Sequence, residues 1–340
     1  MKLLVVGVGS IGRRHAANLR ALDAGPVSVT DSDGGRLAHV ARELDVRAVP
    51  DLAAGLEAGP DGVIVCTPTH RHLGVARAAV EAGAHVFVEK PLAPSLDGVD
   101  RLAEAAARHG RHVYVGCNMR FHPGIATVRT ALAGGAVGRA RSYYARFIHA
   151  LSNRRPPGQD YRDTYSARRA EGGGVILDGV HELDYLRWLE GEVAGVDAWA
   201  ARVSDLEMDV EDTAIVMLQF VCGAIGQVLL DFVSPVKLRG CEVIGDTAVV
   251  RWMSEGKVPE RVRVTRETPG GKPEILFEAD AYDSNAMYVE EMRHFVNAVD
   301  GAATPLADIG DGTRALDLAL RALALAESRG ATLTRGVESR

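Results

Sequence analysis

The chain opens with a short apolar run, Leu3–Val6, that is followed directly by three glycines, Gly7, Gly9 and Gly12. The run is typical of a buried parallel strand, and glycines at this spacing are typical of the turn into a following helix. Gly7 permits the tight turn, Gly9 lets a pyrophosphate approach the backbone, and Gly12 lets the helix pack closely. The first twelve residues therefore predict an α/β unit with a doubly wound parallel sheet that binds a dinucleotide.

The residues after the glycines support this prediction. The helix should open near Ser10 and Ile11, so that backbone N–H groups face the phosphates. A second predicted strand ends in Asp31, nineteen residues after the last glycine, where a carboxylate can bond the adenosine ribose. A surface aspartate in an ordinary turn is the alternative. Asp31 would repel a 2′-phosphate, which favours NAD, while the nearby Ser32 and Arg36 leave NADP open.

Composition limits the class of protein and the number of domains. A chain of 340 residues is long enough for two domains, and 47% hydrophobic with 25% charged residues is typical of a globular protein. A formal charge of −6 argues against a nucleic-acid partner, and no apolar run is long enough to span a membrane. Four scattered cysteines lack metal-ligand spacing, so we expect reduced thiols, no bound metal and a cytoplasmic location.

Strands and helices alternate up to about residue 118, which predicts a first domain over residues 1–119 and a second over 120–340. Longer strands follow in the second domain. They are expected at 141–147, 193–203, 213–221, 224–232, 241–244 and 248–252. This pattern predicts a large, mostly antiparallel open sheet with helices on one face. The other face is apolar enough to suggest a homodimer or homotetramer interface.

Two loops follow predicted strands of the first domain and should converge with the glycine turn. One loop holds Thr67, Pro68 and His72 and is expected to line the cofactor, although a loop histidine can also simply bond backbone. The other holds Glu89, a candidate partner for the ribose or for Lys90.

Lysine is rare in this chain, and arginine supplies nearly all the positive charge. Lys90 is one of only five lysines, and Lys237, Lys257 and Lys272 are expected on the surface. An amine near a cationic nicotinamide can lose and regain a proton, whereas a guanidinium effectively cannot. We therefore expect Lys90 to act in general acid–base catalysis.

A second cluster combines three glycines, residues 172–174, with Asp178 and His181. Residues three apart on a helix share a face, and a carboxylate beside an imidazole is a common general-base arrangement. An aspartate stabilising the helix dipole next to a buried histidine would give the same pattern. The residues alone leave this choice open.

Together these motifs resemble those of the Gfo/Idh/MocA oxidoreductases, over nearly the whole chain. The matching motifs, in order, are the glycine turn, Thr67-Pro68…His72, Glu89-Lys90-Pro91, Asn118-Met-Arg120-Phe121 and the triple glycine with His181. The resemblance implies a Rossmann domain, an α/β domain, and NAD(P)-dependent chemistry at a sugar or cyclitol carbon. It also implies that Lys90 and His181 are catalytic, and that Asn118 and Arg120 lie at the domain junction near nicotinamide and substrate.

One spacing departs from the family pattern. The family places an aspartate four residues before the histidine, whereas Asp178 lies only three before His181. If the glycines are aligned with the family motif, Asp178 takes the catalytic and substrate-binding role of the family's aspartate. If His181 is aligned instead, Leu177 stands at that position. The shorter spacing, with the upstream segment 160–165, is similar to a branch associated with nucleotide-linked and modified sugars.

Eight arginines lie between residues 139 and 169 of this acidic protein. They could clamp a substrate phosphate or carboxylate, and on this interpretation Tyr161 and Arg162 bind substrate. Alternatively, they belong to an exposed loop balanced by neighbouring acids, or to a subunit interface.

These observations predict an NAD-dependent dehydrogenase acting on a secondary alcohol of a sugar nucleotide, sugar phosphate, amino sugar or cyclitol. Two alternatives use the same fold: a dinucleotide-binding sensor without catalysis, and an NAD-dependent glycosidase. The first would not reduce NAD, and the second would release an aglycone without accumulating NADH.

Overall fold

The computed structural model describes residues 1–154, 160–256 and 258–329, which form two compact units. The first, the Rossmann unit, comprises Met1–Phe121 and Asn285–Leu316. The second, the sheet unit, comprises His122–Ser284 and the chain from Asp317 onward. Residues 285–316 therefore pack with the first unit, although they follow the sheet unit's strands in the chain.

Six parallel strands form the sheet of the Rossmann unit, in the order β3-β2-β1-β4-β5-β6. They are β1 (Leu3–Val6), β2 (Val27–Thr30), β3 (Arg47–Ala48), β4 (Gly62–Val65), β5 (His85–Val88) and β6 (Val113–Val115). The strand order reverses between β1 and β4, and ligands of such sheets bind beyond the carboxyl ends of the strands at this point. The loops after β1, β4 and β5 lie at that edge.

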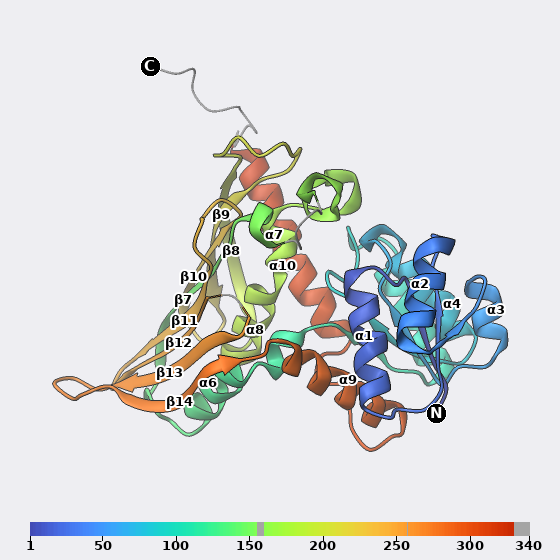
Figure 1. Cartoon of the computed structure of the whole chain (residues 1–340). Helices are drawn as coiled ribbons and strands as arrows, with labels where there is room; N and C mark the ends of the chain where they lie inside the picture. Colours follow the sequence, from blue (N-terminus) through green and yellow to red (C-terminus); the bar gives the residue numbers. More distant parts are fainter. Residues whose placement is uncertain (155–159, 257, 330–340) are drawn as a thin grey trace. The chain divides into compact units, whose positions relative to one another are not determined.

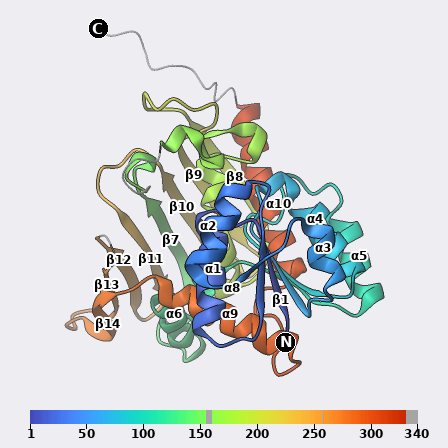
Figure 2. The ribbon, with the colours of Figure 1, turned by 45° about the vertical axis from the view of Figure 1, so that its right-hand side comes forward.

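Helices cover both faces of this sheet (Figure 2). One face carries α1 (Ser10–Ala21), α2 (Gly34–Leu44) and α9 (Asn285–Val299), which packs on α1. The other face carries α3 (Leu52–Glu57), α4 (His72–Glu81) and α5 (Val99–His109), and short turns η1 (Thr69–Arg71) and η2 (Asn118–Phe121) follow β4 and β6. Because helices cover both faces, the central strands are apolar and almost fully buried.

Eight strands form the sheet of the second unit, in the order β14-β13-β12-β11-β7-β10-β9-β8. They are β7 (Ala140–Ile148), β8 (Val193–Ala201), β9 (Thr213–Phe220), β10 (Ile225–Asp231), β11 (Leu238–Gly245), β12 (Val249–Glu255), β13 (Glu260–Glu267) and β14 (Glu274–Tyr282). Every neighbouring pair is antiparallel except β7 with β10, which run parallel. The expected large, mostly antiparallel sheet is confirmed.

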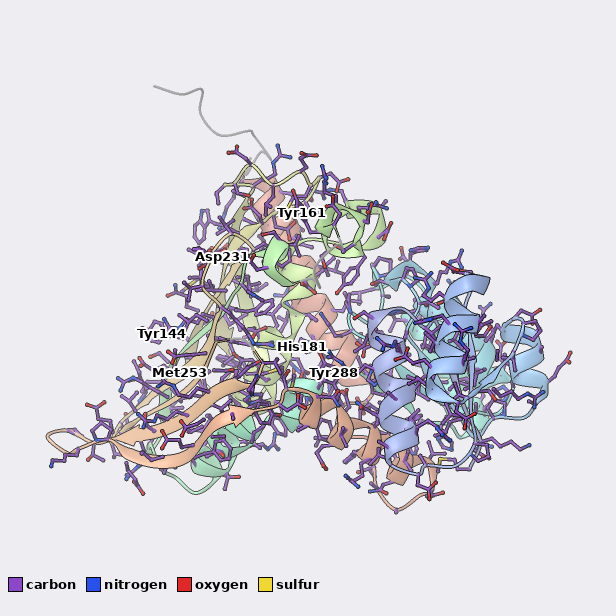
Figure 3. The ribbon with its side chains drawn as sticks, viewed as in Figure 1. Tyr144, Tyr161, His181, Asp231, Met253 and Tyr288 are labelled. Atoms are coloured by element: carbon purple, nitrogen blue, oxygen red, sulfur yellow. The ribbon has the colours of Figure 1, made fainter. Side chains whose placement is uncertain are left out.

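One face of this sheet is covered by α6 (Pro123–Ala133), α7 (Val175–Asp178) and α8 (Val180–Glu190) (Figure 1). Along β7, Tyr143 and Phe147 are buried on the covered face, whereas Tyr144 points to the opposite face and is 46% exposed. In Figure 3, Tyr144 and Met253 lie on this open face and His181 lies on the covered side. Helix α10 (Ile309–Ser328) completes the fold, and its residues are divided between the two units.

The sequence does not indicate α6, α9, β13 or β14. In β13 and β14 charged residues alternate with apolar ones, so the strands lack a long apolar run. Their charges are neutralised across the pair, since Arg263 pairs with Glu278 and Arg266 with Glu274. Such pairing depends on strand register, which the local sequence does not reveal.

No helix in the described part of the chain has both the length and the apolar character that crossing a membrane requires. Across the same residues, His, Cys, Asp and Glu side chains nowhere gather in threes in a way that could hold a metal ion. The four cysteines are free thiols, and only Cys222 is exposed.

Candidate active site

The glycine turn after β1 has the geometry that its spacing predicts. Gly7 has a positive φ of 88°, and a Cβ there would lie 2.7 Å from the carbonyl oxygen of Cys66. A Cβ on Gly12 would lie 1.8 Å from the carbonyl oxygen of Gly7, so only glycine allows α1 to pack this closely. A Cβ on Gly9 would meet nothing within 4 Å, which leaves that backbone open to a ligand.

The start of α1 fits an anionic group. Its first residue, Ser10, is exposed and Ile11 is half-buried. Gly9 precedes the helix and provides no side-chain cap, so the N–H groups of the first turn are not capped from there. These groups and the helix dipole together suit the pyrophosphate of a dinucleotide.

Asp31 follows β2 and is held beside the glycine turn. Its carboxylate accepts hydrogen bonds from the backbone N–H groups of Val8 at 2.7 Å and Asp33 at 2.8 Å. The Arg36 guanidinium lies 3.3 Å from the same carboxylate. Each carboxylate oxygen has further acceptor capacity, so this fixed group can still accept hydrogen bonds from ribose hydroxyls.

We expect Asp31→Ser to weaken NAD binding at least about tenfold, because it removes a charged hydrogen-bond acceptor. The same change should improve NADP binding relative to NAD, since the repelling carboxylate is lost and Arg36 is released toward a 2′-phosphate. Isothermal titration with both cofactors measures the two affinities. Asp33→Ser is the matched control, because Asp33 also pairs with Arg36 but caps α2. Equal NAD to NADP ratios in Asp31→Ser and the parent would contradict the assignment.

His72 connects the loop after β4 to the loop after β5. Its ring is buried, with Nδ1 at 3.0 Å from the carbonyl oxygen of Pro91 and Nε2 at 2.9 Å from that of Thr67. Burial lowers the pKa of the imidazole despite these two carbonyls. His72 therefore bonds backbone, which is the alternative that the sequence left open. Both ring nitrogens already lie at backbone carbonyl oxygens. A direct contact between His72 and the cofactor stays a prediction.

Two side-chain atoms at the carboxyl edge of the sheet fit a ligand. Oγ1 of Thr67 and Oδ1 of Asn118 are buried and have no hydrogen-bond partner among the described residues. Buried polar atoms of this kind are usually satisfied, so a bound group is the simplest source of a partner. Pro68 is exposed beside Thr67. These positions agree with the predicted cofactor contacts, which the structure does not test.

The Glu89-Lys90 pair follows β5 directly. Glu89 is 9% exposed, and its carboxylate accepts hydrogen bonds from His15 at 2.6 Å and from the backbone N–H of Lys90 at 3.1 Å. Burial alone would raise the pKa of Glu89, but the bond from His15 and the charge of Lys90 bring it below its usual value. Lys90 itself is half-buried. The structure shows Glu89 bonded to the backbone of Lys90, while its pairing with the Lys90 amine or with the ribose stays a prediction.

Arg120 belongs to η2 and is buried. Its guanidinium donates to the carbonyl oxygen of Leu306 at 2.6 Å and to the carboxylate of Asp311 at 3.0 Å, all within the Rossmann unit. These bonds hold residues 285–316 against the Rossmann sheet. The substrate contact expected for Arg120 stays a prediction.

Asp178 and His181 are not on one continuous helix, which corrects the interpretation from their spacing. Asp178 ends α7, Gly179 interrupts the helix, and His181 is the second residue of α8. A Cβ on Gly179 would lie 2.7 Å from the Leu230 side chain, so close packing on β10 requires the glycine. Both side chains are buried, with exposed fractions of 2% for Asp178 and 8% for His181.

Asp178 is positioned by Tyr165, which the sequence does not single out. The phenol of Tyr165 donates a hydrogen bond of 2.9 Å to Oδ1 of Asp178. The triple glycine makes this approach possible, because a Cβ on Gly173 would lie 2.3 Å from the carbonyl oxygen of Tyr165. The only sequence signal for this contact is that Tyr165 belongs to the segment 160–165 noted above.

Glu211, two residues before β9, anchors the start of α7. Its carboxylate accepts the Ile176 N–H at 3.1 Å and fills the space that a Cβ on Gly174 would occupy. Burial raises the pKa of this carboxyl to about 7, although the bond from Ile176 lowers it. Glu211 thus carries a proton in the folded protein at mildly acidic pH.

The raised pKa of Glu211 predicts a pH dependence of stability. The folded protein binds this proton up to about pH 7, whereas the unfolded chain releases it near 4.5, so stability falls as pH rises between these values. The difference between these two pKa values corresponds to roughly 3 kcal/mol of stability. We expect Glu211→Gln, which keeps an acceptor for Ile176, to remove most of this loss. Urea unfolding at pH 5 and pH 8 measures the loss of stability in the parent and in Glu211→Gln. The same loss in both proteins would contradict the prediction.

An ion pair fixes α8, which carries His181. Glu182 is fully buried, and both its oxygens accept from Arg239 of β11, at 2.7 and 3.0 Å. The guanidinium also lies 4.7 Å from the ring centre of Phe147. This bidentate pair ties the first turn of α8 to the sheet.

Most of the arginines between residues 139 and 169 already have partners, which favours the exposed, balanced loop over the clamp. Arg162 pairs with Asp160 and Glu207, and the hydroxyl of Tyr161 accepts the backbone N–H of Glu207. The other pairs are Arg141–Asp246, Arg168–Asp163, Arg168–Glu171 and Arg169–Glu327, while Arg139 donates to Cys222 and Arg146 to Met253. Arg155 lies outside the described residues. Substrate binding by Tyr161 and Arg162 stays a prediction.

One lysine expected on the surface is not there. Lys237 is mostly buried and pairs with Glu260, whose other oxygen accepts the hydroxyl of Ser254. Lys272 is exposed as expected, and Lys257 lies outside the described residues.

Comparison with known proteins agrees with this architecture. Residues 1–117 match the model of an oxidoreductase family with an NAD-binding Rossmann fold, and residues 125–272 match the GFO/IDH/MocA C-terminal domain. An inositol 2-dehydrogenase of Acidothermus cellulolyticus is 30% identical over 84% of this chain and 82% of its own length. A myo-inositol 2-dehydrogenase of Thermotoga maritima is 29% identical over 93% of both chains.

A solved structure gives the same result. The UDP-N-acetylglucosamine 3-dehydrogenase GnnA of Acidithiobacillus ferrooxidans superposes with a TM-score of 0.78 at 26% identity, over 96% of this chain and 98% of the other. The two matching family domains lie in the order expected from the sequence motifs. The chain is therefore a member of the Gfo/Idh/MocA oxidoreductase family, with an NAD-binding Rossmann domain at its N-terminus.

Proposed function

We propose that this protein is an NAD-dependent dehydrogenase that oxidises a secondary alcohol of a sugar or cyclitol. The observation that carries the proposal is the position of the Lys90 amine. Lys90 lies two residues after β5, at the same carboxyl edge of the sheet as the glycine turn that suits a dinucleotide. The relatives named above act on inositol and on a UDP-sugar, which are both ring polyols.

Bound NAD supplies the acceptor for the hydride that leaves the alcohol carbon. The protein's contribution is to orient the alcohol and to take its proton. Lys90 is the group that takes this proton, because its side chain is a half-buried amine two residues after β5. His181 and Asp178 bind substrate hydroxyls and share in the proton transfer, with Asp178 held by Tyr165.

Within this class, we favour a substrate recognised mainly through its hydroxyls. The arginines that could clamp a phosphate are mostly paired with acids of this chain, so they offer little free positive charge. Cyclitols, amino sugars and neutral sugars therefore rank above sugar phosphates.

The test is a panel of cyclitols, neutral and amino sugars, sugar phosphates and sugar nucleotides, assayed for NAD reduction by absorbance. We expect at least one hydroxyl-rich ring to be oxidised. Release of an aryl aglycone without NADH accumulation would instead show a glycosidase. Binding of NAD with no turnover of any member would support the sensor.

We also propose that the open face of the eight-stranded sheet joins two copies of this chain. It carries exposed apolar side chains on neighbouring strands, namely Tyr144, Trp199, Ile215 and Ile225. Apolar groups spread over so many strands are typical of an interface. Replacing Trp199 and Ile215 with lysine should lower the mass seen by light scattering to that of one chain. A parent protein that is already monomeric at micromolar concentration would contradict the proposal.

Free thiols and an NAD-dependent activity suit the cytoplasm, where we propose the protein works. Cell fractionation followed by immunodetection tests this location.

A further inference from the structure

His15 and Glu89 form a buried pair that the general mechanism does not use. His15 is fully buried on α1, and its Nε2 lies 2.6 Å from Oε1 of Glu89. The two residues are 74 positions apart in the chain. The other carboxylate oxygen, Oε2, accepts the backbone N–H of Lys90 at 3.1 Å. Glu89 thus joins the helix that starts at the glycine turn to the residue that carries the amine.

The surroundings of His15 orient its ring toward Glu89. Its Nδ1 is buried and has no partner among the described residues, whereas Nε2 faces a carboxylate. The ring packs edge-on against Phe87 at 5.2 Å and Tyr288 at 6.0 Å between centres. A carboxylate only accepts hydrogen bonds, so Nε2 is the ring nitrogen that donates to Glu89.

The pair also places the negative charge of the Glu89 carboxylate next to Lys90. Against the effect of burial, the hydrogen bond from His15 and the nearby positive charge lower the pKa of Glu89, so the carboxylate keeps its negative charge. Space for the carboxylate is provided by Gly116, where a Cβ would lie 3.3 Å from Oε2. An ionised carboxylate this close favours the ammonium form of a lysine.

We propose that His15 is a positioning residue of the reaction: it holds Glu89 ionised against the backbone of Lys90 and thereby fixes the amine. The proposal rests on the proposed function only in giving Lys90 the proton transfer. It predicts that the bond from His15 matters for turnover and for the charge state of Lys90 more than for cofactor affinity.

Other titratable or charged groups face the pair from several elements. They are Arg14 on α1, Cys66 after β4, His72 on α4, and Tyr288 and Glu291 on α9. Burial raises the pKa of the Cys66 thiol and the Tyr288 phenol, and it lowers that of His72. These three groups therefore stay neutral around neutral pH, and all five are unchanged in the His15 and Glu89 variants below.

Three substitutions at His15 separate the hydrogen bond from packing. Glutamine places its amide N–H near the position of Nε2 and should still donate to Glu89. Asparagine places its amide near Nδ1 and cannot reach, and leucine fills space without donating. We expect His15→Gln to retain most of the turnover, while His15→Leu and His15→Asn lower kcat about tenfold and change KM for NAD less than threefold.

The pH profile gives a readout that packing alone would not move. Without the His15 donor, only the charge and the backbone N–H of Lys90 oppose burial at Glu89, so the pKa of Glu89 rises and its negative charge is weakened. The acidic limb of kcat should shift about one pH unit downward in His15→Leu, as the adjacent negative charge is weakened. Glu89→Gln should give the same shift, and the double variant no further shift. Tyr288→Phe, which keeps the ring beside His15, is the packing control.

A second readout does not need turnover. The chain has only five lysines, so the carbon-13 dimethyl-lysine signals can be resolved and the one from Lys90 assigned with Lys90→Arg. Its titration midpoint should fall by about one pH unit in His15→Leu and not in His15→Gln. An unmoved midpoint in His15→Leu overturns the proposal, and so does a similar loss of kcat in the glutamine and leucine variants. If Lys90→Met keeps full turnover, the proposed function fails, while the midpoint still decides the role of His15.

Discussion

Replacing Lys90 with methionine should lower turnover at least about a hundredfold, while NAD affinity changes less than about threefold. Methionine keeps the length and apolar stem of the lysine but has no group that can hold a proton. Loss of a general acid–base group usually costs two to four orders of magnitude in rate, that is, about 10²–10⁴-fold. The backbone N–H of residue 90, which bonds Glu89, remains in the variant. Steady-state kinetics on the best member of the panel, with titration of NAD binding, measures both quantities.

The matched control is Lys272→Met, because Lys272 is an exposed lysine of the sheet unit. It removes the same charge and should leave turnover unchanged. Turnover of Lys90→Met equal to that of the control would remove Lys90 from the mechanism.

Replacing Arg239 with methionine should lower the free energy of unfolding by about 3–5 kcal/mol. The substitution leaves the carboxylate of Glu182 buried without the two hydrogen bonds that Arg239 donates. An unpaired buried charge is far more costly than the pair itself is stabilising. Urea denaturation followed by circular dichroism measures the change.

The double variant Glu182→Gln, Arg239→Met is the control, because it removes the charge together with its partner. It should recover most of the lost stability, since replacing both members of a buried pair is often close to neutral. Turnover should fall in the single variant, because Glu182 adjoins His181 on α8. If single and double variants unfold at the same urea concentration, burial of the unpaired charge is not the cause.

The Rossmann sheet could be predicted from the sequence because its signals are local. The apolar strand, the turn at Gly7 and the acid at Asp31 depend on residues close together in the chain. The break between α7 and α8 could not be predicted in this way. It lies at Gly179, which packs against Leu230 of a distant strand. Strand β13 was missed for a related reason, since Arg263 and Arg266 find their acidic partners only once β14 is in register.

In the candidate site, too, residues with local sequence signals could be predicted and those that act through distant contacts could not. The motif residues Thr67, Asn118 and Lys90 could be named from the sequence. Their supporting residues could not, because His15, Tyr165 and Glu211 act through contacts with residues 74, 13 and 35 positions away. No periodicity of the sequence indicates such pairs, and only the folded chain brings them together.

The single parallel pairing of β7 with β10 has a consequence for how this protein is made. During synthesis, β7 leaves the ribosome long before either of its neighbours, since β10 and β11 both follow α7, α8, β8 and β9 in the chain. Until they arrive, both edges of β7 expose backbone groups that can pair with other chains. Non-local pairing of this kind is slow, so the yield of active protein should rise when translation is slowed by cooling.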